Sequence, residues 1–203
     1  MTISHSNDNA GARLAATLWP ADETQTRLLR GAVLAVFGTL ILWASAKVSV
    51  PMWPVPMSMQ TFAVMVLAMA YGFRLGTATV LLYLLEGALG LPVFANTPAH
   101  GIGLAYMAGP TGGYLAGFVV CAAMVGWLAD RGWDRNLGLA LIAYTLGTVA
   151  IFGLGVAWLT YLIGFEKAVT AGLVPFIPGE FLKIALAAGL VSAIWRILDK
   201  RPR

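Results

Sequence analysis

Residues 175–195, PFIPGEFLKIALAAGLVSAIW, set the class of this fold. The apolar run at about 181–198 is long enough to cross a bilayer, and prolines and a glycine precede it, as at a helix start. Glu180 and Lys183 lie three residues apart near that start, so they share one helix face. Ionisable residues in a membrane helix are costly and usually functional, so the pair predicts a binding site. The alternative is a self-satisfied ion pair at the membrane edge, with Lys183 reaching toward water.

The composition is that of a membrane protein. Of 203 residues, 59% are hydrophobic and 11% are charged, whereas a soluble domain has about 25% charged residues. The unbroken apolar runs predict an all-α polytopic protein. Residues 28–203 are expected to form one membrane domain, and the polar segment 1–27, which lacks a signal-peptide core, a cytoplasmic tail. The net charge of +4 does not indicate nucleic-acid binding, because basic residues mark the cytoplasmic ends of spans.

Six transmembrane helices account for the apolar segments. They are expected at about 28–46, 58–71, 75–89, 114–129, 137–163 and 181–198. With the N-terminus inside, ten of the 13 Lys and Arg residues fall on the cytoplasmic side, Lys47 and Lys167 fall outside, and Lys183 lies within a span. This bias predicts that both termini are cytoplasmic and that the last span starts at the outer face.

The three unusual connections all fall on the outer side of this topology. Segment 48–57 holds three prolines and is expected to be a stiff, extended loop. Segment 90–113 holds six glycines and three prolines but no Lys or Arg. Non-helical backbone this apolar has to be buried in protein or line a cavity, so we expect it at the mouth of a pocket. The third connection is 164–178. Together they predict a protein that captures a ligand from outside.

Enzymatic chemistry is not indicated. The sequence has no Gly-rich phosphate loop ending in Lys-Ser or Lys-Thr, and His5 and His100 are its only histidines. No metal cluster or catalytic triad can be assembled, and no cofactor is expected. The run 109–113, which includes Gly112, allows either a tight turn with close helix packing or a place against a ligand.

Four motifs resemble the BioY family. They are PMWPVPMSMQTF at 51–62, GLPVF at 90–94, GPTGGYL at 109–115 and PGEFLK at 178–183, and the resemblance covers about residues 28–198 in order. BioY proteins are the biotin-specific substrate-binding (S) components of energy-coupling factor (ECF) transporters. The resemblance therefore implies six helices, a prokaryotic plasma membrane and an outward-facing biotin pocket. It also implies two kinds of partner, a transmembrane coupling protein and two ATPase subunits that use ATP.

The resemblance also assigns roles to residues. The acid and the lysine of the last helix hold the ureido ring of biotin in this family, and they match Glu180 and Lys183. Aspartate is common where this chain has Glu180, so the reach of that contact differs. The loop asparagine of the family matches Asn96. The loop between the first two spans, with Met52 and Trp53, is expected to act as a lid.

The residues fit the same ligand on chemical grounds. Biotin's ureido group offers two N–H donors and one carbonyl acceptor, which suit a carboxylate and an ammonium three residues apart. Its thioether ring and valeryl chain suit an apolar wall. Candidates for that wall are Trp53, Phe94, Tyr106 and Tyr114, although each one taken singly is as readily explained as an aromatic residue at the membrane interface.

Three other functions are alternatives to biotin capture. The first is an S component for another vitamin, which the acid and lysine pair disfavours. The second is a solitary small-molecule carrier, which is disfavoured because no inverted repeats with matching broken helices are seen. The third is a membrane enzyme, which would need a metal-binding cluster that the sequence lacks.

Overall fold

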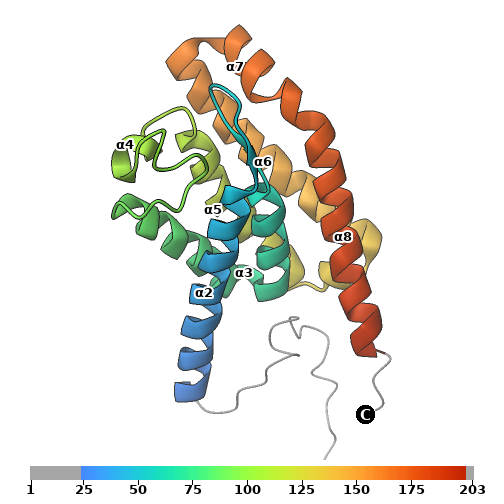
Figure 1. Cartoon of the computed structure of the whole chain (residues 1–203). Helices are drawn as coiled ribbons and strands as arrows, with labels where there is room; N and C mark the ends of the chain where they lie inside the picture. Colours follow the sequence, from blue (N-terminus) through green and yellow to red (C-terminus); the bar gives the residue numbers. More distant parts are fainter. Residues whose placement is uncertain (1–23, 200–203) are drawn as a thin grey trace, which may run out of the picture.

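The computed structural model describes residues 24–199, so most of the predicted tail lies outside the described residues. Within this range helices dominate (Figure 1). The helices are α2 Thr24–Lys47, α3 Gln60–Ala88, α4 Gly103–Met107, α5 Gly112–Ala129, α6 Leu137–Ile163, α7 Phe165–Gly172 and α8 Ile177–Asp199. The 3-10 turns η2 Trp133–Arg135 and η3 Val174–Phe176 precede α6 and α8, and strands β1 Ser49–Val50 and β2 Met57–Ser58 pair as a hairpin. The predicted all-α class is confirmed.

Helix α3 turns back on itself at Gly72. This residue has φ 75° and ψ −175°, a conformation that only glycine adopts readily. After the turn the chain runs back along itself, so that a Cβ on Gly76 would lie 3.1 Å from Ala68 Cα. The two arms, 60–71 and 73–88, correspond to the second and third predicted helices.

Five stretches of the described residues are long and apolar enough to cross a membrane. One of them is the whole of α3, and another runs from α7 through α8, over Phe165–Leu198. Each arm of α3 has fewer than the roughly 20 residues of a typical membrane crossing. By length and composition, α3 is therefore one candidate span, although the fold divides it into two arms. The six predicted helices are present, and the last one begins a turn earlier than predicted.

Small residues let α5 pack closely between α3 and α6. At Gly117 a Cβ would lie 2.6 Å from Ile151 Cα of α6, and at Gly126 it would lie 2.7 Å from the carbonyl carbon of Gly72 in α3. Such approaches require residues without a side chain, as is common between membrane helices. The turn between α5 and α6 lies toward the end of the molecule away from the hairpin and α7 (Figure 1).

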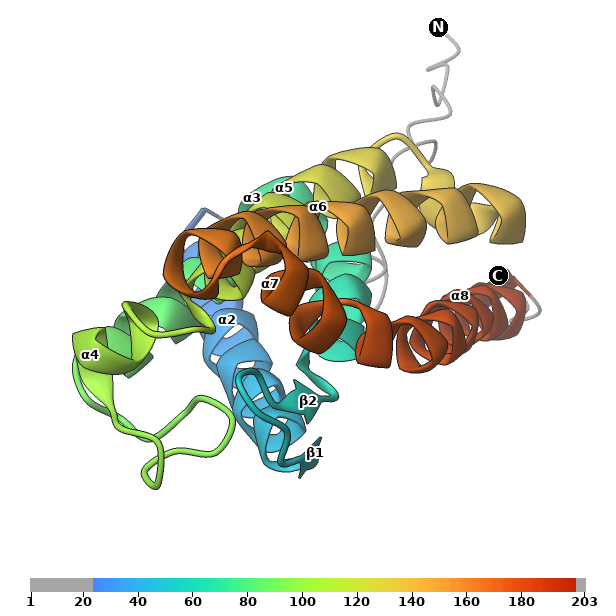
Figure 2. The ribbon, with the colours of Figure 1, turned by 90° about the horizontal axis from the view of Figure 1, so that it is seen from above.

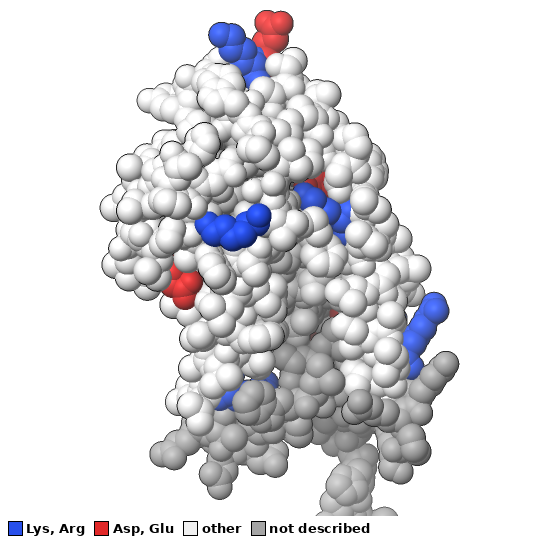
Figure 3. Space-filling view, viewed as in Figure 1, with Lys and Arg blue, Asp and Glu red and all other residues white. Residues whose placement is uncertain are grey.

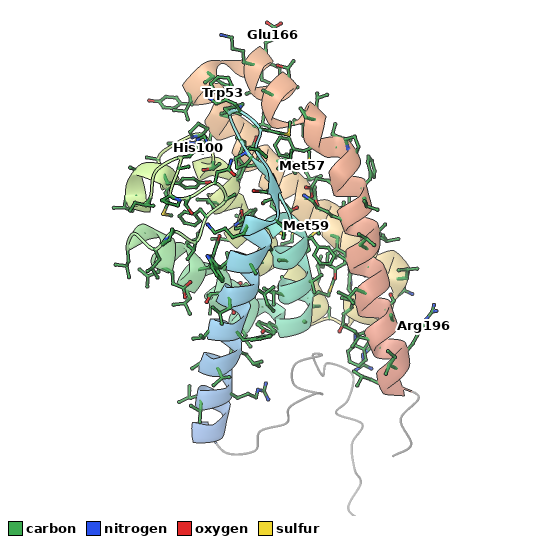
Figure 4. The ribbon with its side chains drawn as sticks, in the orientation of Figure 1. Trp53, Met57, Met59, His100, Glu166 and Arg196 are labelled. Carbon is green, nitrogen blue, oxygen red and sulfur yellow. The ribbon has the colours of Figure 1, made fainter. Side chains whose placement is uncertain are left out.

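The molecule has two different ends. The hairpin, α4 and α7 gather at one end, whereas the start of α2 and the end of α8 lie at the other (Figure 1). Viewed from above, α7 bridges the outer ends of α6 and α8, and the hairpin lies beside the end of α2 (Figure 2). Trp53 and Glu166 mark the loop end, and Arg196 marks the opposite end (Figure 4). Between the ends, the face in Figure 3 carries few charged atoms, as expected of a surface in lipid.

Two predicted connections are more ordered than expected. Segment 48–57 is a β-hairpin, with Ser49 opposite Ser58 and Val50 opposite Met57, rather than a simple extended loop. Segment 164–178 contains the eight-residue helix α7, which the sequence analysis did not predict.

Candidate ligand-binding site

The two charges of the last span lie side by side in the first turns of α8. Lys183 Nζ is 2.7 Å from Glu180 Oε1. Both residues are buried, with only 4% of Glu180 and 6% of Lys183 exposed. Burial of two charges costs free energy unless each is paired and further hydrogen-bonded, so their surroundings are decisive.

Ser58 at the end of β2 and Thr61 at the start of α3 complete the network around this pair. Lys183 Nζ donates to the Ser58 carbonyl at 2.7 Å and to the Thr61 hydroxyl at 3.1 Å, in addition to Glu180. The Thr61 hydroxyl donates to Glu180 Oε1 at 3.0 Å. Each of the three ammonium protons therefore has an acceptor. Glu180 Oε2 has no hydrogen-bond partner among the described residues, so the pair presents one free acceptor atom.

Two adjoining cavities lie beneath the hairpin. The outer cavity has a volume of about 250 Å³, and its wall includes Met52 and Trp53 of the hairpin tip, Ala95, Asn96 and His100 of the long loop, and Thr111. The deep cavity has a volume of about 40 Å³. Its polar lining includes Ser58 of β2 and Thr61 of α3, and its aromatic lining includes Tyr114, Phe118, Phe152 and Phe176. Because Ser58 and Thr61 bond directly to Lys183, the charged pair lies immediately behind the wall of the deep cavity.

A third space, the lateral groove, lies between α6 and α8 and has a volume of about 420 Å³. Its wall is mostly apolar, and Glu180 is the charged residue in it. Phe152 lines both this groove and the deep cavity, so its ring separates the two spaces. Glu180 therefore borders the groove directly, and a hydrogen bond from Thr61 links it to the lining of the deep cavity.

Three of the four aromatic candidates line the cavities beneath the hairpin. Trp53 is 77% exposed and borders the outer cavity. Tyr106 borders both cavities, and its hydroxyl donates to the Ala95 carbonyl at 2.9 Å. Burial raises the pKa of Tyr106, partly offset by a hydrogen bond with Thr111, so the hydroxyl stays a donor at neutral pH. Tyr114 borders the deep cavity and donates to the Gly172 carbonyl at 2.7 Å, which ties α5 to α7.

Phe94 and Gly112 line none of these three spaces. Phe94 is 1% exposed, its ring stacks on Tyr106 with centroids 5.0 Å apart, and it occupies the space where Gly87 has no side chain. A Cβ on Gly112 would collide with the Met107 carbonyl. Of the two readings left open for the glycine run, the geometry supports the tight turn with close packing.

Asn96 lies in the wall of the outer cavity. Its φ is 57°, in the left-handed region that asparagine tolerates better than most residues. The Ser49 hydroxyl donates to Asn96 Oδ1 at 3.4 Å, so the hairpin and the long loop meet at this side chain. The loop that was expected to act as a lid and the loop asparagine are therefore in contact in the fold.

Several residues of the site were not among the sequence candidates. Thr61 and Ser58 hold the charged pair, and Phe152 and Phe176 supply rings to the deep cavity. A signal for the first two was present, because Ser58, Gln60 and Thr61 are polar residues at the start of an apolar span. The two phenylalanines carry no comparable signal, since apolar rings are common throughout the spans.

A family comparison decides the classification. The family model described as "BioY family" matches residues 16–200, which is most of the chain. The chain belongs to the BioY family. The resemblance found in the four sequence motifs is thereby confirmed, including the motif that carries the buried acid and lysine.

Curated BioY relatives match along most of their own length. "Biotin transporter BioY" of Thermotoga maritima is 36% identical over 161 residues, which cover 79% of this chain and 92% of the relative. "Biotin transporter BioY" of Rhizobium etli is 33% identical over 171 residues, covering 79% and 89%. "Probable biotin transporter BioY" of Pyrococcus horikoshii is 37% identical over 142 residues, covering 70% and 82%. These relatives are transporters, which confirms the prediction that the chain is not an enzyme.

The fold also matches a solved structure. A crystal structure of the S-component for biotin from an ECF-type ABC transporter matches with a TM-score of 0.72, covering 86% of this chain and 95% of that chain. Sequence identity in this match is 22%, so it is the fold that is shared. The chain is a multi-pass membrane protein with the architecture predicted from its apolar segments.

Proposed function

We propose that this protein captures biotin at the loop end of the molecule. The observation that carries the proposal is the buried pair of Glu180 and Lys183 behind the deep cavity, with Glu180 Oε2 free to accept a hydrogen bond. Membership of the BioY family and the biotin transporters among its relatives support the choice of ligand. The cavities open beneath the hairpin at the end that the positive-inside rule places outside the cell.

The ureido group of biotin fits the polar end of this site. A ureido N–H matches the free acceptor atom of Glu180, and the ureido carbonyl matches the Lys183 ammonium. Since all three ammonium protons have acceptors, the ligand carbonyl has to replace one of them. The Ser58 carbonyl belongs to β2 of the hairpin, so a shift of the hairpin can release it without disturbing either helix. Ligand binding and hairpin movement are coupled in this scheme.

The remaining parts of biotin fit the less polar walls. The thioether ring suits the rings of Tyr114, Phe152 and Phe176 in the deep cavity. The valeryl chain then extends into the outer cavity, where Asn96 and Thr111 offer donors to its carboxylate. The outer cavity alone approaches the lower end of the roughly 300–1,000 Å³ typical of small-molecule sites, so a modest opening of the deep cavity accommodates the whole ligand.

Mass spectrometry and calorimetry test this function. Small molecules released from the purified protein should include biotin, and titration of protein freed of ligand should show saturable biotin binding. Thiamine and riboflavin serve as controls for an S component of another vitamin. If one of these binds and biotin does not, the ligand assignment is wrong.

We further propose that the protein acts as the S component of an ECF transporter in a prokaryotic plasma membrane. Its sequence contains no phosphate-binding loop, and in this proposal the energy for uptake comes from a coupling protein and ATPase subunits. In vesicles, biotin should accumulate against a gradient only when those subunits and ATP are added. Accumulation by the chain alone would favour the solitary carrier instead.

A further inference from the structure

The long loop at the outer cavity is held by side chains from three helices. Its segment 92–97 belongs to no helix or strand, so its carbonyls need partners from elsewhere. Tyr83 of α3 donates to the Val93 carbonyl at 2.8 Å, and Tyr106 of α4 donates to the Ala95 carbonyl at 2.9 Å. Lys47, the last residue of α2, supplies the remaining side-chain donors described below. The backbone of segment 92–97 is therefore shaped by side chains from outside it, and Lys47 is the most distant of them in sequence.

Lys47 binds three of these carbonyls at once. Its ammonium donates to the carbonyls of Pro92 at 2.8 Å, Phe94 at 3.1 Å and Thr97 at 3.1 Å. It also lies 3.1 Å from the Thr97 hydroxyl, which itself donates to the Phe94 carbonyl at 2.6 Å. A single ammonium at the centre of three carbonyls restricts the path of the whole segment, because each acceptor has to point toward one atom.

The segment that Lys47 fixes is part of the ligand cavity. Ala95 and Asn96, which lie between its acceptors Phe94 and Thr97, line the outer cavity, whereas Lys47 lines none of the three spaces described. Asn96 adopts a positive φ that needs support from its surroundings, and its side chain also accepts from Ser49, two residues after Lys47. Lys47 at the end of α2 thus holds the backbone on both sides of Asn96, and Ser49 of β1 holds its side chain.

We infer that Lys47 is a positioning residue for ligand binding: it holds the 92–97 loop so that Asn96 faces the ligand. This inference rests on the proposed capture of biotin, and it adds a residue that acts without touching the ligand. Loss of the ammonium leaves three carbonyls without their shared donor, and the loop then samples conformations in which Asn96 is displaced. Ligand affinity then falls, because part of the binding free energy is used to order the loop again.

The first experiment needs no ligand. Hydrogen exchange of the ligand-free protein is compared between wild type, Lys47→Met and Lys47→Arg. Lys167→Met is the matched control, since Lys167 is an exposed lysine on α7 at the same end of the molecule. In Lys47→Met, the amides of segment 93–101 should exchange faster while those of α5 and α6 do not change. Lys47→Arg, which keeps a cationic donor, should restore most of the protection. Unchanged exchange in Lys47→Met would overturn the inference.

The second experiment tests the link to the ligand by double-mutant cycles with biotin. Lys47→Met should weaken biotin affinity by roughly 10-fold, and Lys167→Met should have no effect. In an Asn96→Ala background the effect of Lys47→Met should largely disappear, whereas in a Glu180→Gln background it should persist in full. A general loss of fold would instead affect both backgrounds alike and would overturn the inference, as would an unchanged affinity in Lys47→Met.

The two proposals fail in different ways. If the wild-type protein binds no biotin, the proposed function fails, while the exchange comparison still shows whether Lys47 holds the loop. If the wild type binds biotin and the cycle shows no coupling between Lys47 and Asn96, the proposed function stands and the role of Lys47 as a positioning residue is rejected.

Discussion

Gln60 Nε2 donates a 2.7 Å hydrogen bond to the Tyr83 hydroxyl, although both residues belong to α3. In a straight helix residues so far apart would be separated by roughly 35 Å, at 1.5 Å per residue. The bond exists because α3 turns back at Gly72, and it joins the start of the first arm to the second arm. Tyr83 in turn donates to the Val93 carbonyl, so the fold of α3 is linked to the loop that lines the outer cavity.

Gly72→Ala should destabilise the protein, because alanine at φ 75° and ψ −175° is strained. Backbone strain of this kind costs about 1–3 kcal/mol. The measurement is thermal unfolding of the purified protein in detergent. Gly153→Ala is the control, since a Cβ at Gly153 meets no atom within 4 Å inside α6, and alanine is the better helix former there. Equal midpoints for wild type and Gly72→Ala would show that the turn does not require glycine.

Reporter fusions test the orientation in the membrane. Fusions after residue 203 and in the turn 130–136 should report a cytoplasmic location, and a fusion near His100 should report an external one. The reason is the distribution of charge: Arg131 and Arg135 lie in the turn after α5 and Arg196 lies near the end of α8, whereas Lys47 lies at the end of α2 against the long loop. An external signal at the C-terminus would reverse the orientation and, with it, the direction from which ligand enters.

The sequence predicted the helices well because membrane helices are encoded locally. The expected span 137–163 coincides with α6, since an unbroken apolar run has to satisfy its backbone within one helix. Helix α7 was missed because it has only eight residues and carries exposed charges such as Glu166. The predicted loop 164–178 has no long apolar run of its own, so nothing in its pattern required a helix.

The site was only partly predictable because its contacts join distant parts of the chain. Glu180 and Lys183 could be paired from their spacing alone, but the bond from Lys183 to Ser58 spans 125 residues. Phe94 was one of four aromatic candidates for the apolar wall of the ligand site. Its ring is instead buried, since Gly87 leaves a space for it, and no local pattern links those two residues.

Trp195→Phe should destabilise the end of the molecule opposite the hairpin in a pH-dependent way. Trp195 Nε1 donates to the buried Asp134 Oδ2 at 2.9 Å. Burial raises the pKa of Asp134 above 3.8, against the lowering effect of that hydrogen bond and of Arg135. The folded state therefore favours the neutral acid, and the contribution of Asp134 to stability falls as pH rises through its raised pKa. Removing the indole donor raises this pKa further, so the variant's deficit should grow with pH.

The measurement for this variant is the unfolding midpoint near pH 3.8, the ordinary pKa of aspartate, and at neutral pH. A buried carboxylate without its donor should cost about 1–3 kcal/mol at neutral pH. Trp43→Phe, on the exposed surface of α2, controls for loss of an indole. A deficit that is equal at both pH values would mean that the ring packs against Asp134 without stabilising its charge.

The final prediction concerns the charged pair itself. Lys183→Met leaves the ureido carbonyl without its donor, and Glu180→Gln keeps the shape of the side chain but removes the counter-ion of Lys183. Charged hydrogen bonds are worth about 1.5–3 kcal/mol, so each variant should lose roughly 10- to 150-fold in biotin affinity. The double variant should lose less than the sum, because either single change also strands the other charge.

Thr61 separates ligand contact from support of the pair. Its hydroxyl joins Glu180 to Lys183 behind the deep cavity, so Thr61→Val should weaken biotin binding by only about 2- to 10-fold, as for one neutral hydrogen bond. Thr170→Val is the matched control, because that hydroxyl bonds only within α7. Titration with biotin and with an analogue carrying sulfur in place of the ureido oxygen completes the test. The analogue should bind the wild type more weakly than biotin does, and Lys183→Met should remove that difference, since sulfur is a poorer acceptor for the ammonium. If Glu180→Gln and Lys183→Met both bind biotin as the wild type does, the pair only holds α8 to α3 and the ligand binds elsewhere.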